Sequence, residues 1–214
     1  MASEQLNNML SGRLYDARDP ELAAARLRAR QLVARYNGAS PEEDALRQEL
    51  ARELFGKMGE GCYLEPPLRC DYGSHLFLGD RVYANFNLVV LDCAAVTIGN
   101  DVLIGPNVGI YTAGHPVDPG LRKENLEFAR PVTIEDGVWI GGHSVIAPGV
   151  RIGRNSVIGA ASVVTKDIPA NVVAVGNPCR VMRAITEKDR EFDVSGRRGD
   201  RRTGGNTASN SPLW

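Results

Sequence analysis

Histidine is the natural general base near neutral pH, and this 214-residue chain holds three histidines. His143 sits inside a regular stretch of sequence and His75 follows a glycine-containing turn, positions typical of surface or interface residues. His115 stands between a glycine and a proline, in a segment too long for a simple connection. We therefore predict that His115 accepts a proton from a reacting group.

The sequence on both sides of His115 repeats every six residues. This period fits neither a helix of 3.6 residues per turn nor a simple alternating strand, and it indicates short strands that turn corners at a fixed interval. We predict a mainly β fold in which three hexapeptides make each turn of a prism and successive turns stack to close a core. The aliphatic positions of the repeat are Ile98, Ile104, Ile110, Ile134, Ile140, Ile146, Ile152, Ile158 and Val164.

The repeat is interrupted once, between Ile110 and Ile134. The gap of 24 positions is a whole number of hexapeptides, so a loop at about 111–131 can leave the wall without losing the register. Before Ile98 about two extra residues intrude, and we expect an irregular coil there. Small residues after the aliphatic positions predict tight turns or positive φ; they are Gly99, Gly105, Gly141, Gly153 and Gly159.

Around the prism, which we place at 61–180, the sequence predicts three other regions. Residues 1–60 form a helical subdomain, with one helix beginning at Asp19-Pro20 and a second at Ser40-Pro41, where a capping-box spacing occurs. Residues 181–192 form a C-terminal helix. Residues 193–214 are rich in Gly, Ser, Asn and Arg, which predicts a disordered tail.

The composition of the chain excludes some classes of function. The formal net charge of −1 gives no overall attraction for nucleic acid or an anionic membrane, and no stretch is apolar enough to span a bilayer. The four cysteines form no CxxC pair and no secretion signal follows Met1, so we expect a cytoplasmic protein with free thiols. A Cys62–Cys70 disulfide ranks below that interpretation.

Several separate motifs together resemble the maltose and galactoside O-acetyltransferase family of hexapeptide-repeat acyltransferases. They are Ala84-Asn85-Phe86-Asn87, Gly114-His115-Pro116-Val117, Val138-Trp139-Ile140-Gly141-Gly142 and Gly176-Asn177-Pro178-Cys179-Arg180. The resemblance implies a left-handed parallel β-helix, acetyl transfer from acetyl-CoA to a hydroxyl, usually of a sugar, and a homotrimer with active sites between subunits.

The resemblance also implies roles for individual residues. His115 would remove the acceptor's proton during direct transfer without a covalent acyl-enzyme, and Asn85 joins the catalytic set. Glu127 would orient His115 or stabilise its charged form, with a solvated loop carboxylate as the alternative. A backbone N–H near Gly142 would bind the oxyanion of the tetrahedral intermediate.

Acceptor and donor sites follow from the same resemblance. Short carboxylates and amides suit sugar hydroxyls, and the acceptor candidates are Asp16, Asp71, Tyr83, Asn85, Asp92 and Cys93. Asp16 and Asp71 are equally compatible with turn or cap roles, and galactoside-type relatives carry an acid in place of Cys93. The donor candidates, with cations for the phosphates of coenzyme A, are Trp139, Gly142, Ala160, Thr165, Lys166, Arg180 and Arg183.

Three other functions remain open from the sequence. The acceptor is equally compatible with a hydroxyl of a xenobiotic, such as an antibiotic. A γ-class carbonic anhydrase also uses three histidines, but it pairs two of them a few residues apart, and no second histidine occurs between Pro116 and Glu127. We therefore expect no metal. The third alternative is a prism that keeps the repeat without catalysis.

Overall fold

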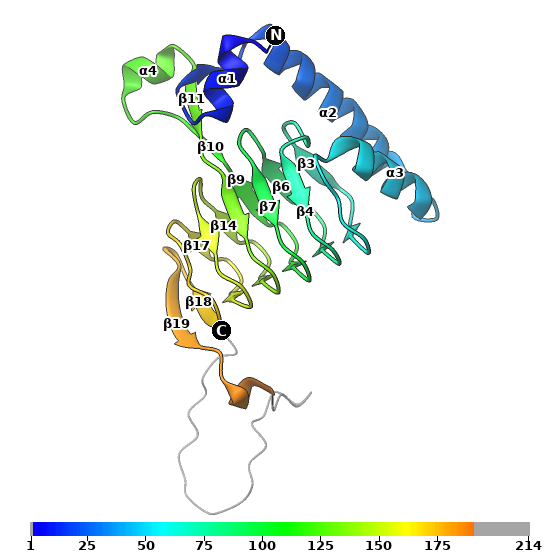
Figure 1. The fold of residues 1–214 in the computed structure, drawn as a ribbon, viewed down its shortest axis with the longest axis vertical. Coiled ribbons are helices and arrows are strands. Elements are labelled where there is room, and N and C mark those ends of the chain that lie inside the picture. The colour runs from blue at the N-terminus through cyan, green and yellow to red at the C-terminus, as the bar shows by residue number, and fades with distance from the viewer. Residues whose placement is uncertain (1, 191–214) are drawn as a thin grey trace, which may run out of the picture.

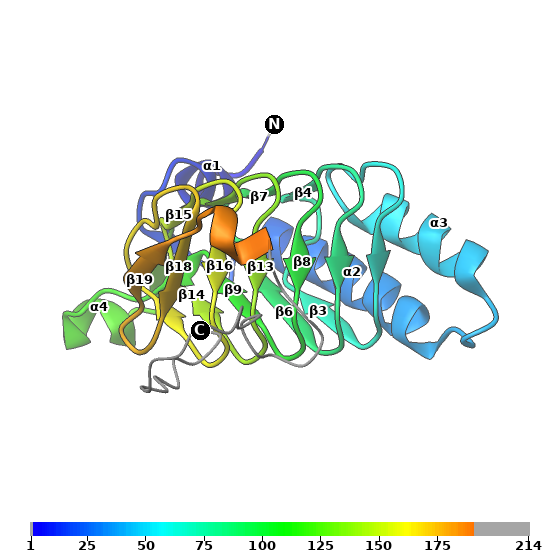
Figure 2. The same cartoon turned by 90° about the horizontal axis from the view of Figure 1, so that it is seen from below.

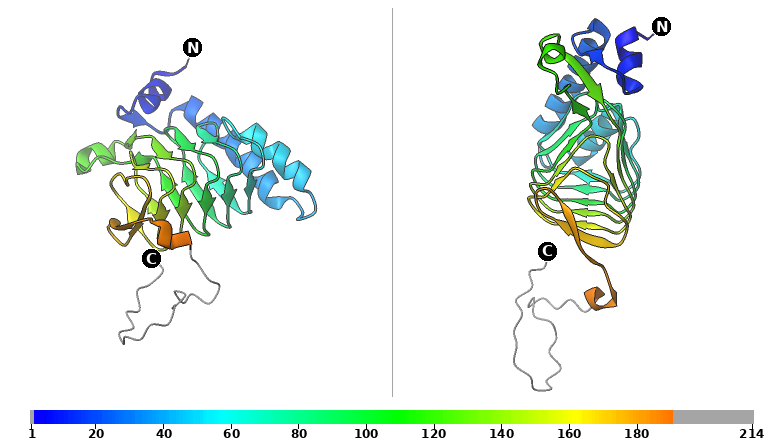
Figure 3. Two further views of the ribbon diagram at one scale, coloured as in Figure 1. Left: turned by 60° about the horizontal axis from the view of Figure 1, so that its bottom comes forward. Right: turned by 90° about the vertical axis from the view of Figure 1, so that its left-hand side faces the viewer.

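The computed structural model describes residues 2–190, and most of them form a parallel β-helix whose turns stack along the molecule (Figure 1). Viewed along the stack, in the right-hand view of Figure 3, the turns lie behind one another. Within the described residues the walls are sheets of seven, five and four strands, called here the seven-, five- and four-stranded faces. Strand pairing is parallel except between the last two strands of the seven-stranded face.

The strands are short, and most are two to four residues long. The seven-stranded face contains β2 (Tyr63–Leu64), β5 (Tyr83–Ala84), β8 (Leu103–Ile104), β13 (Trp139–Ile140), β16 (Val157–Ile158), β18 (Val172–Val175) and β19 (Arg180–Ala184). The five-stranded face contains β3 (Leu68–Cys70), β6 (Leu88–Leu91), β9 (Gly109–Tyr111), β14 (Val145–Ile146) and β17 (Val163–Val164). The four-stranded face contains β4 (Leu76–Leu78), β7 (Val96–Ile98), β12 (Val132–Ile134) and β15 (Arg151–Ile152).

The core lies inside the prism and is built from the repeated aliphatic side chains. Ile104, Ile140 and Ile158 pair in register across β8, β13 and β16 and are at most 1% exposed. Burying a side chain of this size contributes about 1.5–3 kcal/mol. The hexapeptide period therefore predicted the wall correctly, because each turn needs one inward aliphatic residue per face.

The early turns are longer than the late ones, and the extra residues lie in one corner. Leu78 pairs with Ile98, twenty positions later, whereas Ile140 pairs with Ile158, eighteen positions later. The additional residues fall between the five- and four-stranded faces, at 71–75 and 92–95; we call this the wide corner. The two extra residues expected before Ile98 are therefore found in this corner, while the strands on either side of it stay in register.

The repeated glycines lie where the backbones of successive turns come close together. A Cβ on Gly141 would lie 2.5 Å from the backbone N of Ala160, and one on Gly99 would lie 2.6 Å from that of Asp136. Positive φ falls instead two positions after the glycines, as at His143 (φ 61°). The expected positive φ at the glycines themselves is thus not found, because the contact between stacked turns is what excludes a side chain there.

Helices cover the N-terminal end of the prism in Figures 1 and 2. They are α2 (Pro20–Gly38) and α3 (Asp44–Leu54), whereas α1 (Glu4–Leu10) lies away from that end, beside the start of α2. The Asp19 side chain caps α2, whose first residue is Pro20, as the sequence predicts. The Tyr36 hydroxyl donates to the Leu64 carbonyl at 2.5 Å, which ties α2 to the first turn.

The third helix begins later than predicted. The Glu43 carboxylate accepts the Ser40 N–H at 2.8 Å, while Ser40 Oγ is 3.4 Å from the Glu42 N–H. Residues 41–43 therefore form a turn, and α3 starts at Asp44 rather than at Pro41.

The predicted C-terminal helix at 181–192 is shorter than expected, because its first four residues belong to a strand. Residues Arg180–Ala184 form β19, antiparallel to β18, and a single 3₁₀ turn follows at Glu187–Arg190. Pairing with β18 satisfies backbone groups at the edge of the sheet, which a helix would leave open. The tail predicted at 193–214 lies outside the described residues.

In the third turn the wide corner expands into a long hairpin. Strands β10 (Ala113–Gly114) and β11 (Leu126–Ala129) pair antiparallel, and α4 (Pro119–Lys123) lies between them. Strand β1 (Tyr15–Asp16) of the N-terminal subdomain pairs with the other edge of β11, so α1 and α4 lie at the same edge of the molecule (Figure 1). No helix in residues 2–190 is long and apolar enough to cross a membrane.

Candidate active site

His115 follows directly on β10, at the base of the long hairpin. Gly114 makes this placement possible, because a Cβ there would lie 2.6 Å from Cζ of Phe128 on the paired strand. The Nδ1 atom of His115 is 3.1 Å from the carbonyl oxygen of Leu126. Since a carbonyl can only accept, Nδ1 carries the proton and the neutral ring keeps its lone pair on Nε2.

Glu127 faces this lone pair from the neighbouring strand. Its Oε1 lies 4.0 Å from His115 Nε2, and its side chain is 23% exposed against 55% for the imidazole. The other oxygen, Oε2, accepts a hydrogen bond of 2.8 Å from the hydroxyl of Tyr15, its register partner across β1 and β11. Glu127 is thus held in place beside His115 and is not a freely solvated loop carboxylate.

Asp71 and Cys93 lie in the wide corner, on consecutive turns. The Cys93 thiol donates to Asp71 Oδ2 at 3.6 Å. Burial, followed by the negative charge of Asp92, raises the pKa of Asp71, and burial raises the pKa of Cys93 to about 12. Cys93 is therefore a neutral thiol donor, and Asp71 is a half-buried carboxylate with one oxygen anchored.

Asp92 has a different role from its neighbours in the wide corner. Its side chain is fully buried and accepts hydrogen bonds from the backbone N–H groups of Asp71, Tyr72 and His75, at 3.0, 2.9 and 3.3 Å. Burial raises its pKa. Although the sequence placed Asp92 among the acceptor contacts, its oxygens are turned into the backbone, and it shapes the corner that presents Asp71.

Asp16 lies on β1 beside the hairpin, but its carboxylate is engaged. Arg18 holds both oxygens, with Nε 2.9 Å from Oδ1 and Nη2 2.7 Å from Oδ2. This interaction lowers the pKa of Asp16 to about 2. A sugar hydroxyl would therefore meet an Asp16–Arg18 pair and not a lone carboxylate.

A second group of predicted residues lines a groove of about 320 Å³ on the seven-stranded face. Its lining includes Tyr83 and Asn85 together with Pro106 and several glycines. Trp139 is 41% exposed and Leu103 is 49% exposed, so the groove has apolar walls. The predicted residues in this groove are Tyr83, Asn85, Trp139, Gly142 and Ala160.

The backbone of this groove leaves two N–H donors, those of Gly142 and Ala160, without an acceptor in the described part of the chain. The N–H groups of Gly141 and His143 donate to the carbonyls of Ile158 and Pro106. Within residues 2–190 the N–H of Gly142, between them, donates to no acceptor. Asn85 Oδ1 accepts from the N–H of Phe86 at 2.7 Å, which fixes the orientation of its side-chain amide.

The predicted phosphate-binding residues lie toward the C-terminal end of the prism, and all four are exposed: Thr165, Lys166, Arg180 and Arg183. Arg180 Nη1 donates to the Cys179 carbonyl at 2.8 Å. The Arg183 guanidinium already pairs with both oxygens of Asp189, at 2.8 and 2.9 Å. A phosphate at Arg183 would share the guanidinium with Asp189.

In a single chain the predicted site residues therefore lie in two separate groups. His115, Glu127, Asp16, Asp71 and Cys93 surround the wide corner and its hairpin, between the five- and four-stranded faces. The groove residues lie on the seven-stranded face and at its corner with the five-stranded face. Among residues 2–190, the hydrogen bonds and the ion pair of the His115, Glu127 and Asp71 side chains stay within the first group: His115 with Leu126 and Glu127, Glu127 with Tyr15, and Asp71 with Cys93.

The other two histidines lie apart from His115. His75 Nδ1 is 2.7 Å from the Asp92 carbonyl oxygen, in the wide corner, and His143 Nε2 is 3.3 Å from Asn107 Nδ2, at another corner. The described residues contain no group of three or more His, Cys, Asp or Glu side chains arranged to hold a metal ion.

Two side chains that the sequence did not single out belong to the first group. Tyr15 contacts Glu127, and Arg26 donates to the Tyr72 hydroxyl at 2.8 Å and to the Ala17 carbonyl at 2.6 Å. Both come from the N-terminal subdomain. β1 and β11 are more than a hundred residues apart in the sequence, and their pairing brings Tyr15 to the site. No local sequence pattern indicates such a contact.

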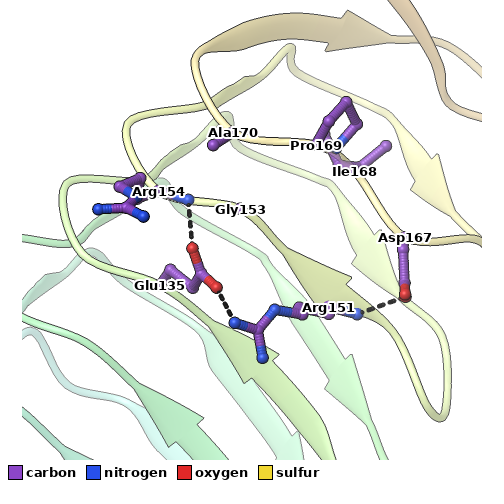
Figure 4. Close-up of a pocket in the computed structure, with 8 residues that line it drawn as sticks. All are labelled: Glu135, Arg151, Gly153, Arg154, Asp167, Ile168, Pro169 and Ala170. Carbon is purple, nitrogen blue, oxygen red and sulfur yellow. Dashed lines mark hydrogen bonds and ion pairs between the residues drawn. The ribbon is translucent and has the colours of Figure 1, made fainter.

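A larger cavity, of about 470 Å³, lies on the four-stranded face (Figure 4). Glu135 pairs with the Arg151 side chain and accepts the backbone N–H of Arg154 at 2.8 Å, while Asp167 accepts the backbone N–H of Arg151 at 2.8 Å. Among its lining residues none is a histidine or a nucleophile. We do not assign the chemistry to this cavity.

Comparison with known proteins agrees with the fold and the motifs. Residues 8–59 match the maltose acetyltransferase hexapeptide capping motif, and residues 131–166 match the bacterial transferase hexapeptide repeats. The chain is 48% identical over 182 residues to galactoside O-acetyltransferase of Escherichia coli, covering 85% of this chain and 90% of that protein.

Two solved structures are also similar. One is a galactoside acetyltransferase in complex with coenzyme A, with a TM-score of 0.87 and 46% identity over 89% of this chain and 96% of that one. The other is a maltose O-acetyltransferase from Clostridium difficile 630, with a TM-score of 0.85 and 45% identity over 87% of this chain and 100% of that one.

Fold and matches define a hexapeptide-repeat acyltransferase, the class of enzyme that includes O-acetyltransferases using acetyl-CoA. Within that class, the chain belongs to the maltose and galactoside O-acetyltransferase family. The family resemblance drawn from its motifs is thus confirmed, as is the parallel β-helix with its N-terminal helices.

Proposed function

We propose that the protein transfers the acetyl group of acetyl-CoA directly to a hydroxyl of a sugar, with His115 as the general base. The main support is the hydrogen bond from His115 Nδ1 to the Leu126 carbonyl, which leaves the Nε2 lone pair available for the acceptor's proton. The relatives named for galactoside and maltose acetylation supply the substrate class.

The reaction needs one proton transfer in each direction. His115 Nε2 takes the hydroxyl proton as the oxygen attacks the thioester carbonyl, forming a C–O bond and an oxyanion. When the intermediate collapses, the C–S bond breaks and the imidazolium returns the proton to the sulfur of coenzyme A. Glu127 at 4.0 Å stabilises the imidazolium between these steps.

The oxyanion requires a donor that is not already engaged. The N–H of Gly142 meets this condition within the described residues, and it opens onto the apolar groove beside Trp139. We assign it to the oxyanion and the groove to the pantetheine arm. Lys166 and Arg180 are then placed to meet the phosphates, with Thr165, Ala160 and Arg183 nearby.

A complete site combines the hairpin of one subunit with the groove of another, in a homotrimer. The division of the predicted residues into two groups supports this arrangement. The acceptor then meets Asp71, Cys93 and the Asp16–Arg18 pair from one copy and Asn85 and Tyr83 from its neighbour. Short polar groups in fixed directions suit the hydroxyls of a sugar ring.

A substrate screen tests the function. Purified protein with acetyl-CoA is offered maltose, glucose, galactosides and hydroxylated antibiotics, and free thiol release is followed. The proposal expects release that depends on a sugar and saturates with it. Release with antibiotics alone would move the acceptor class to xenobiotics, and release with no acceptor in the panel would contradict the assignment.

A further inference from the structure

The hydroxyl of Tyr15 is a buried polar group that the mechanism above does not use. Tyr15 is fully buried, among Met9, Leu22, Tyr72 and Ala129. A tyrosine in such a place is compatible with packing alone. Its hydroxyl, however, donates to Glu127 Oε2 at 2.8 Å, so it contacts the carboxylate that faces His115.

A second hydrogen bond of the site lies beside this contact. Cys93, in the same buried cluster as Tyr15, donates its own proton to Asp71 at 3.6 Å. Burial raises the pKa of Tyr15, so the phenol keeps its proton throughout the working pH range. The Glu127 carboxylate therefore has a permanent donor at Oε2.

The geometry explains what the donor does for Glu127. A glutamate side chain has three rotatable bonds, and the carboxylate can turn away from His115 unless one oxygen is held. The Tyr15 hydroxyl holds Oε2, and the antiparallel register of Tyr15 with Glu127 leaves Oε1 directed at His115 Nε2. Such support by a second residue is what keeps a reacting group in its productive geometry.

We propose that Tyr15 is a positioning residue of the transfer site, whose hydroxyl fixes the Glu127 carboxylate against His115. This inference rests on the proposed function, because it assigns Tyr15 a role through His115 and Glu127. It also gives the N-terminal subdomain a part in the reaction, since Tyr15 lies on β1, outside the β-helix.

A double-mutant cycle separates positioning from packing. Tyr15→Phe keeps the buried ring and removes the hydroxyl. We expect it to lower kcat about 10- to 100-fold, while KM for acetyl-CoA changes less than about twofold. In a Glu127→Ala background the same change should lower kcat less than about threefold further, because the group that Tyr15 positions is gone.

Tyr36→Phe is the matched control. It also removes a buried hydroxyl, the one that donates to the Leu64 carbonyl, far from the hairpin. We expect its kcat to match the native value at a temperature where circular dichroism shows both Phe variants folded.

Two results would overturn the role of Tyr15: native kcat in Tyr15→Phe, or the same fold loss with and without Glu127. Failure of the proposed function looks different. In that case His115→Ala would keep its turnover, or no sugar would be acetylated by the native protein.

Discussion

At the scale of single residues, Asp71 links acceptor binding to stability. Its pKa is raised by burial and by Asp92, so its negative charge is less favourable in the folded than in the unfolded chain. This destabilisation is present above the raised pKa and fades as pH falls through it toward the unfolded value. The ionised Asp71 carboxylate thus lowers the free energy of unfolding, as expected of a group retained for binding.

Asp71→Asn should therefore raise the melting temperature at pH 7–8, and the difference from the native protein should shrink as the pH falls to about 4. Acetyl transfer should fall in the same variant. Melting followed by circular dichroism between pH 4 and 8 measures the effect. A native protein that is the more stable at pH 7, or a difference independent of pH, would contradict the assignment.

Asp101→Asn gives the control with the opposite sign. Arg81 lowers the pKa of Asp101, so this carboxylate contributes stability that is present above its unfolded pKa and lost as pH falls through the folded one. Asp101→Asn should therefore be slightly less stable than the native protein at pH 7, with the gap closing on acidification.

The sequence predicted the position of several site residues, while their roles stay predictions. His115 and Glu127 lie on the hairpin that interrupts the repeat, and the Gly142 N–H has no acceptor within the described residues. Tyr15 was missed because its contact with Glu127 depends on a strand pairing between distant segments. The burial of Asp92 was missed for a similar reason, since its partners lie on the turn below.

At the scale of elements, the hairpin of β10 and β11 is the part that presents the base. Gly114→Ala should disturb it, because the new Cβ would lie 2.6 Å from the Phe128 ring. We expect a kcat loss of at least about tenfold, with an overpacking cost of about 1–3 kcal/mol confined to the hairpin. Steady-state kinetics together with thermal melting measure both effects.

Gly38→Ala is the comparison for this variant. A Cβ on Gly38 meets nothing within 4 Å, so its kinetics should remain native. If Gly114→Ala also keeps the native kcat, the close packing of the hairpin does not hold His115 in place.

The elements also show where sequence patterns stop being sufficient. The six-residue period predicted the walls, because every turn must bury one aliphatic residue per face. It did not predict β19 in place of the start of the C-terminal helix, since an open sheet edge decides that pairing. The start of α3 at Asp44 depends on the hydrogen bond between Glu43 and the Ser40 N–H, a choice that the capping-box spacing left open.

At the scale of the whole molecule, the division of the site into two groups makes a prediction about mixed assemblies. A chain with His115→Ala keeps the groove, and a chain with Asn85→Ala keeps the hairpin. Co-expressed in equal amounts, they should recover about a quarter of native activity, the fraction of subunit interfaces that join two intact halves. Thiol release by the whole co-expressed population measures this fraction. Trimers isolated as mixed should reach about a third, because each of them contains one intact site in three. Activity no greater than that of either variant alone would place the whole site in one chain.

The most direct test of the account is acetyl transfer by His115→Ala. We predict a loss of about 10²- to 10⁴-fold in kcat, with acetyl-CoA binding by calorimetry within a few-fold of native, since the base acts on the acceptor hydroxyl and not on the donor. His143→Asn, at a corner where Asn87 and Asn107 hold the same positive φ, serves as the control. Native turnover in His115→Ala would contradict the central claim.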